Sequence, residues 1–172
     1  MTKPSEPSSV TLRPMAFSDI DAVLRIERAS FPTPWPRDAF FYELARPQRS
    51  ICQVAEYHLN ETEAVIVGDI VVWLAGSTAH VATLAVHSEY RRRGIGSCLL
   101  ANALLTSIHR GMKGALLEAR AGNHSAQQLY QKFGFEVAGI RQGYYQDTGE
   151  DAVLMALKPM KRDKLAEFSN CG

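Results

Sequence analysis

Long apolar runs and a strong excess of one charge are both missing from this sequence. The longest apolar stretch, residues 64–76, contains Asp69 and falls short of the roughly 18 residues that a membrane-spanning helix needs. Residues 1–9 are polar and contain prolines, so they lack the apolar centre of a signal peptide. Lys and Arg number 19 against 18 Asp and Glu, which argues against non-specific binding of nucleic acid. We therefore expect no membrane span, no signal peptide and no direct contact with nucleic acid.

Cysteine is also scarce. Cys52, Cys98 and Cys171 are odd in number and lie far apart, so they predict neither a metal-ligand pair nor a disulfide framework. The five histidines are scattered and offer no pair at metal-ligand spacing. We expect a protein without metal or disulfide, in a reducing, cytoplasmic setting.

The length of 172 residues is enough for one domain, and 46% hydrophobic with 22% charged residues is a globular composition. We expect residues 1–9 to be a flexible N-terminal tail and residues 10–158 to form the folded domain. Residues 159–172 are expected to be a polar C-terminal tail, with the basic run Lys158–Lys164 in solvent.

Apolar periodicity and turn residues predict about seven strands and about four helices. The strands are expected over residues 10–14, 50–57, 64–74, 78–87, 115–120, 135–142 and 151–157. The helices are expected over residues 19–30 and 37–45, from the Gly94 loop to 110, and over 125–133. Ser18 is the predicted N-cap of the first helix, and Ser125 with Gln128 the predicted capping box of the last. Short connections between the strands favour antiparallel hairpins, so we expect a mixed, mostly antiparallel α/β sheet.

One loop carries a signal for anion binding. The segment Arg91–Gly96 follows an apolar strand and precedes a helix, whose free N–H groups and positive dipole end suit a phosphate. The segment is no Walker A motif, because Gly-Ser-Cys follows where Gly-Lys-Ser/Thr is required. Leu99 replaces the third glycine of the dinucleotide fingerprint. The alternative is a surface arginine cluster that opens an ordinary helix.

Two residues are candidates for acid–base chemistry. Glu118 stands in an otherwise apolar strand, where partial burial would raise its pKa toward neutrality and make it a usable base. A structural pair with Arg120, on the same side of the strand, is the alternative. Tyr130 lies on the apolar face of its predicted helix and by spacing alone fits a core tyrosine. Cys98 is expected to have a packing role.

The motif R/Q-x-x-G-x-G/A, present here as Arg91–Gly96, resembles the acetyl-CoA signature of the GNAT superfamily of N-acetyltransferases. The resemblance extends from Val10 to Leu157. It is strongest to the ribosomal-protein alanine N-acetyltransferases. The segments that carry this narrower likeness are 117–123, 129–130, 133–135, 141–145 and 150–157.

The resemblance implies a single GNAT-type domain that uses acetyl-CoA as its acetyl donor. The residues that it assigns to acetyl-CoA are Leu84, Ala85, Val86, Arg92, Arg93, Gly94, Ile95, Gly96, Ser97 and Asn123. For Asn123, a plain helix cap is the alternative. The resemblance makes Glu118 the general base and Tyr130 the general acid.

The acceptor implied by the resemblance is a protein α-amine, in particular that of an alanine-starting ribosomal protein. Phe31, Trp35, Tyr144 and Tyr145 would flank the point of acetyl transfer. A monomer or weak dimer is expected. A GNAT enzyme acting on lysine or a small amine, a CoA-binding regulatory module without turnover, and a basic ribosome-associated protein are the alternatives.

Overall fold

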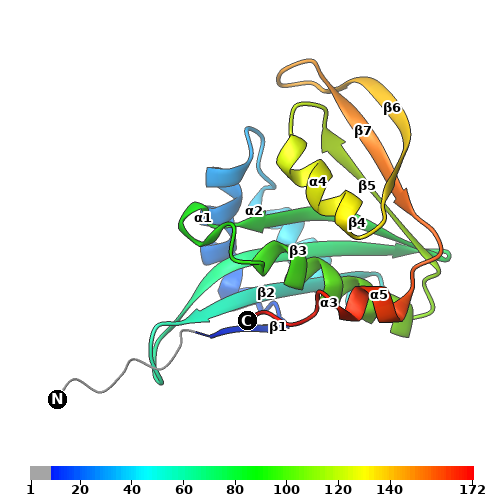
Figure 1. Cartoon of the computed structure of the whole chain (residues 1–172). Helices are drawn as coiled ribbons and strands as arrows, with labels where there is room; N and C mark the ends of the chain where they lie inside the picture. The colour runs from blue at the N-terminus through cyan, green and yellow to red at the C-terminus, as the bar shows by residue number, and fades with distance from the viewer. Residues whose placement is uncertain (1–8) are drawn as a thin grey trace.

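A computed structural model describes residues 9–172 and contains one sheet of seven strands in the order β1-β2-β3-β4-β5-β7-β6 (Figure 1). The strands are β1 (Val10–Pro14), β2 (Ser50–His58), β3 (Ala64–Ala75), β4 (Thr78–Val86), β5 (Gly114–Arg120), β6 (Glu136–Tyr145) and β7 (Glu150–Leu157). All neighbouring pairs are antiparallel except β4 and β5, which are parallel. The expected α/β class and mixed sheet are thereby confirmed.

The parallel pair β4–β5 is joined over a short distance only. The ladder runs from Thr78 opposite Gly114 to His80 opposite Leu116 and includes no later residue of β4. On its other side β4 pairs with β3 as far as Val86. The two central strands therefore separate after His80, and one side of the β4 backbone has no strand partner there.

Helices cover both faces of the sheet. The helix α3 (Ile95–His109) packs on β2, β3 and β4 from one face, whereas α1 (Ile20–Ser30) packs on β3 and β4 from the other. Alternation along the strands separates two buried clusters: Ile70 belongs to the α3 side and Val71 to the α1 side. The short helix α2 (Arg37–Leu44) adds Phe40 to the second cluster. Within residues 9–172, no helix is long and apolar enough to cross a membrane.

The helix starts differ from the two predicted caps. A 3₁₀ turn over Phe17–Asp19 precedes α1, and the Asp19 carboxylate accepts the Ala16 N–H at 2.7 Å, so Ser18 is not the cap. The helix α4 (His124–Lys132) begins one residue before the expected Ser125. Its cap is Asn123, whose side-chain oxygen accepts the Ala126 N–H at 3.1 Å. An Asn at this position reaches the third helical N–H directly, which makes the Ser125–Gln128 box unnecessary.

The C-terminal segment 159–172 is packed against α3, and the expectation of a solvated polar tail is wrong. It contains the helix α5 (Arg162–Ala166), whose Leu165 is buried. Phe168 packs on Phe133 with ring centroids 4.5 Å apart. Cys171 forms a disulfide with Cys98 of α3, which also corrects the expectation of no disulfide. The buried side chains of Met160 and Leu165 anchor the segment, whereas the basic side chains between Lys158 and Lys164 are exposed to solvent as expected.

Candidate active site

The separation of β4 from β5 opens two adjoining cavities. The first, which we call the Glu118 cavity, measures about 430 Å³, and the second, the Gly96 cavity, about 560 Å³. Six residues line both: Ser30, Phe31, Leu84, Asn123, Ala126 and Tyr130. A ligand that extends along β4 can therefore occupy both cavities at once.

The Gly96 cavity ends at the N-terminus of α3. Gly94 has φ 80° and Arg92 has φ 64°, and these left-handed conformations fold the loop so that α3 begins at Ile95. Unpaired N–H groups at a helix start favour an anion. Of the residues that the resemblance assigned to acetyl-CoA, those lining this cavity are Leu84, Ala85, Val86, Arg92, Gly94, Ile95, Gly96, Ser97 and Asn123.

The three arginines of the loop have different surroundings. Arg91 donates to the Val86 carbonyl at 2.8 Å and to Ser30 Oγ at 3.2 Å, so it fixes the loop to the end of β4. Arg92 lines the Gly96 cavity. Arg93 does not line it; its guanidinium lies over the Tyr90 ring, 5.2 Å from the centroid. Of the three loop arginines, Arg91 and Arg92 thus bring charge to this cavity, and Lys132 of α4 adds a further positive charge.

Glu118 lies where β5 begins to diverge from β4, and its side chain is 11% exposed. Its Oε2 is 2.6 Å from His80 Nε2, and its Oε1 is 3.8 Å from the Arg141 guanidinium. The alternative of a Glu118–Arg120 pair is wrong. Arg120 instead pairs with Asp147 at 2.7 Å, because the β6–β7 turn brings that carboxylate above the strand end.

Tyr130 is buried between the cavities, with 8% of its surface exposed, and its ring meets Phe135 edge-on. Burial raises the pKa of Tyr130 to about 12. Its hydroxyl therefore keeps its proton at neutral pH and is available as a hydrogen-bond donor at the junction of the two cavities.

Asn123 also lies at this junction and lines both cavities. Its side-chain oxygen already caps α4, so a contact with a ligand would use the amide nitrogen.

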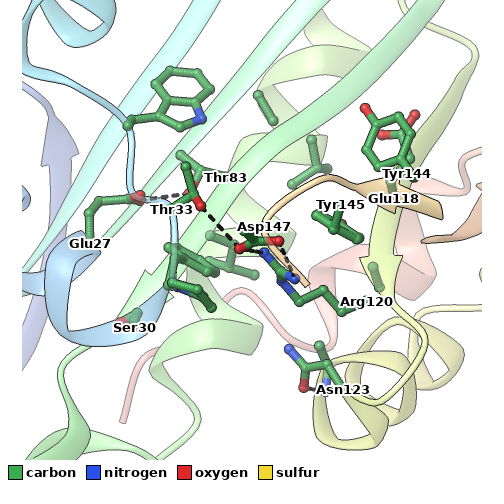
Figure 2. A pocket seen from close by; sticks show the side chains of 18 of the residues that line it. Glu27, Ser30, Thr33, Thr83, Glu118, Arg120, Asn123, Tyr144, Tyr145 and Asp147 are labelled. Carbon is green, nitrogen blue, oxygen red and sulfur yellow. Dashed lines mark hydrogen bonds and ion pairs between the residues drawn. The ribbon is translucent and has the colours of Figure 1, made fainter. Parts of the chain in front are cut away.

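The four aromatic residues expected around the acceptor all line the Glu118 cavity: Phe31, Trp35, Tyr144 and Tyr145. They come from the α1–α2 connection and from the β6–β7 hairpin. Asp147 joins these two elements, because its carboxylate accepts from Thr33 Oγ1 at 3.0 Å and from the Arg120 guanidinium (Figure 2). Sequence reasoning missed Thr33 and Asp147, since nothing local in the sequence relates the two turns.

Two buried carboxyl groups lie at the floor of this region and were also missed. Glu27 lines the Glu118 cavity and accepts from Thr83 Oγ1 at 2.6 Å. Asp69 is fully buried beside Glu27. Burial raises the pKa of both groups, and the proximity of Glu27 raises that of Asp69 further. The only sequence signal was that Asp69 interrupts an apolar strand.

Comparison with known proteins identifies the family. A profile described as the acetyltransferase (GNAT) family matches residues 20–135, more than half of the chain. The chain belongs to this family. The expectation of a GNAT enzyme, which the Arg91–Gly96 motif carried, is therefore confirmed.

Named relatives cover nearly all of the described domain. A Bacillus subtilis protein, provisionally named a ribosomal protein bS18-alanine N-acetyltransferase, is 35% identical over 86% of this chain and 95% of its own. An N-alpha-acetyltransferase of Saccharolobus solfataricus is 32% identical over 85% of this chain and 91% of its own. The crystal structure of the ribosomal-protein-S18-alanine N-acetyltransferase from Escherichia coli superposes with a TM-score of 0.76 and 28% sequence identity. The match covers 88% of this chain and 94% of the Escherichia coli chain.

Proposed function

We propose that this protein transfers the acetyl group of acetyl-CoA to the N-terminal α-amine of a protein, in particular an alanine-starting ribosomal protein in the cytoplasm. The observation that carries the proposal is that Glu118 and Tyr130 line one cavity, which adjoins a helix N-terminus suited to an anion. The relatives named as alanine N-acetyltransferases and N-alpha-acetyltransferases support the same acceptor class.

Acetyl-CoA fits the two cavities as one extended donor. Its pantetheine arm would lie along Leu84–Val86, whose backbone has no β5 partner, and would continue the sheet there. The pyrophosphate would accept from the N–H groups between Arg92 and Ser97. Arg92 adds a positive charge. The thioester would then reach Tyr130, which lines both cavities.

The chain's residues supply the proton transfers. Glu118 takes one proton from the α-ammonium group, and the neutral amine attacks the thioester carbonyl carbon. A backbone N–H of the Leu84–Val86 segment stabilises the resulting oxyanion. The carbon–sulfur bond then breaks while the Tyr130 hydroxyl donates a hydrogen bond to the departing thiolate. The second proton of the attacking nitrogen passes to this thiolate, so that the amide and CoA are the products. The pKa of an α-ammonium group is ~8 and that of a lysine side chain is ~10.4, so an α-amine loses its proton to a carboxylate more readily.

The acceptor enters the Glu118 cavity past the aromatic side chains. Phe31, Trp35, Tyr144 and Tyr145 surround it, and the bridge from Thr33 to Asp147 holds the two sides together. Such an entrance suits an extended chain end with a small first residue better than a folded surface loop.

Mass spectrometry of peptides incubated with acetyl-CoA tests the proposal. Peptides beginning with Ala or Ser should gain one acetyl group, whereas blocked peptides with an internal lysine should react far more slowly. Glu118→Gln should bind acetyl-CoA normally and lower kcat about 100-fold. Faster reaction of blocked lysine peptides or of polyamines would refute the α-amine acceptor, and absence of all turnover would favour a CoA-binding module.

A further inference from the structure

His80 of β4 contacts Glu118 of β5 through its imidazole ring. Its Nε2 lies 2.6 Å from Glu118 Oε2, the shortest contact that the carboxylate makes in residues 9–172. Glu118 lines the Glu118 cavity and His80 does not. His80 therefore contacts the base without contacting the space in which the acceptor would lie.

The sheet register places this contact at the fork between the central strands. His80 opposite Leu116 is the last pair of the β4–β5 ladder, and Glu118 follows two residues later on the same face of β5. The ladder contains no β4–β5 residue pair beyond this one. The His80–Glu118 contact thus extends the connection between the strands by one side-chain bond, at the point where the cavity opens.

Aromatic contacts fix the imidazole ring. Trp73 of β3 meets it edge-on, with centroids 5.3 Å apart, and Trp73 in turn stacks on Trp35 at 5.8 Å. Trp35 lines the Glu118 cavity from the α1–α2 connection. A continuous series of side chains therefore runs from the acceptor entrance through Trp35, Trp73 and His80 to Glu118.

We propose that His80 is a positioning residue for Glu118, an inference that rests on the proposed function of Glu118 as base. An ionised carboxylate can only accept, so the proton of the contact is on His80 Nε2. This bond holds Oε2 toward β4 and leaves Oε1, with Arg141 at 3.8 Å, to receive the proton of the acceptor amine. His80 itself gains and loses no proton in the reaction.

Steady-state kinetics of the full chain with acetyl-CoA and an alanine-starting peptide test this role. His80→Leu removes the donor, and kcat should fall about 10-fold to 100-fold, the range for losing one hydrogen bond to a charged group. The KM for acetyl-CoA should stay within about twofold, since His80 does not contact the Gly96 cavity. His80→Gln keeps a donor at similar reach and should recover most of kcat.

His58→Leu is the matched control. His58 lies on β2 and contacts Thr11 through Nε2 at 2.8 Å, away from both cavities, so this variant should keep the parent kcat. A variant that combines His80→Leu with Glu118→Gln should be no slower than Glu118→Gln alone, because the positioned group is already lost.

The outcomes separate the inference from the function beneath it. If Glu118→Gln lowers kcat but His80→Leu keeps the parent kcat, the positioning role of His80 is overturned and the role of Glu118 as base is not. If His80→Leu and His80→Gln lower kcat to the same extent and also lower the melting temperature to the same extent, His80 has a purely structural role. Parental kcat in Glu118→Gln would overturn the proposed base, and the inference with it.

Discussion

At the residue scale, the two proposed proton-transfer groups differ in the forces that act on them. Glu118 has the donors His80 and Arg141 beside it, which suits a carboxylate that must be ionised before it can accept a proton. Tyr130 is buried, and its pKa of about 12 exceeds the ~8.5 of a typical thiol. Full proton transfer to the thiolate is therefore uphill, so Tyr130 assists mainly by hydrogen bonding as the carbon–sulfur bond breaks.

Tyr130→Phe tests that assistance. The variant keeps the ring that packs against Phe135 and loses only the hydroxyl. We expect kcat to fall about 10-fold to 100-fold, with a melting temperature within about 2 °C of the parent. Enzyme assays and thermal denaturation measure the two quantities. Matching losses of rate and stability would instead indicate a structural hydrogen bond.

Asp69 allows a test of pH-dependent stability. Burial raises its folded-state pKa above the unfolded value, so the protein is most stable while Asp69 is protonated and loses stability as the pH rises through that folded pKa. Asp69→Asn mimics the protonated form. It should match the parent near pH 4 and melt several degrees higher at pH 8.

Thermal denaturation between pH 4 and pH 8 measures this difference. Glu61→Gln in the exposed β2–β3 connection is the control and should shift the melting temperature equally at both ends of the range. If the melting temperatures of Asp69→Asn and the parent differ by the same amount from pH 4 to pH 8, Asp69 is ionised in the folded protein over that whole range.

At the element scale, the proposed pyrophosphate site at the loop Arg91–Gly96 would require close approach of the backbone to the ligand. A Cβ added at Gly96 would meet Leu129 and Val86 at 3.7 Å, which is ordinary contact. Gly96→Ala should therefore fold and bind acetyl-CoA with a modest loss. Gly96→Glu places a longer, negative side chain at the proposed pyrophosphate site and should weaken binding at least about 100-fold. Isothermal titration with CoA measures both variants, and equal affinity in a folded Gly96→Glu would remove the phosphate assignment.

Asp147 allows a test of the connection between the two elements at the acceptor entrance. Asp147→Ala removes the acceptor shared by Thr33 and Arg120, so the α1–α2 connection and the β6–β7 hairpin can separate. We expect the peptide KM to rise about threefold to tenfold while the acetyl-CoA KM stays constant. Asp163→Ala in α5 is the control and should alter neither. A rise of both KM values after Asp147→Ala would show a general disturbance of the cavities.

Most element positions were predictable because they depend on local patterns. Alternation marks the strands and helical spacing marks α1, α3 and α4. The fork between β4 and β5 was not predictable, since pairing depends on distant parts of the chain. The resemblance assigned Glu118 and Tyr130 to one site, and both line the Glu118 cavity. The contacts of Thr33 with Asp147 and of His80 with Glu118, however, span 114 and 38 residues. Such contacts leave no local signal in the sequence.

At the scale of the whole molecule, the C-terminal segment of the chain returns to α3, the helix whose start lines the Gly96 cavity (Figure 1). Leu165 and Phe168 pack in the buried cluster that contains the apolar side chains of α3, and the Ser169 carbonyl accepts from Asn102 at 3.0 Å. Cys98, which Cys171 reaches, lies in the first turns of the same helix that presents Gly96 to its cavity. The C-terminal segment thus stabilises the helix whose start forms the proposed phosphate site.

The Cys98–Cys171 disulfide has a sequence separation of 73 residues, and a loop of that length restricts the unfolded chain strongly. Chain entropy puts the stabilisation at roughly 4 kcal/mol, and engineered cases often give less. Cys171→Ser should therefore lower the melting temperature by about 5–15 °C.

Dithiothreitol should lower the melting temperature of the parent by a similar amount and leave that of Cys171→Ser unchanged. Cys52 is free and takes no part in the disulfide, so a Cys52→Ser control should keep the full response to dithiothreitol. Identical melting of the parent with and without the reductant would show that packing of α5 alone holds the segment.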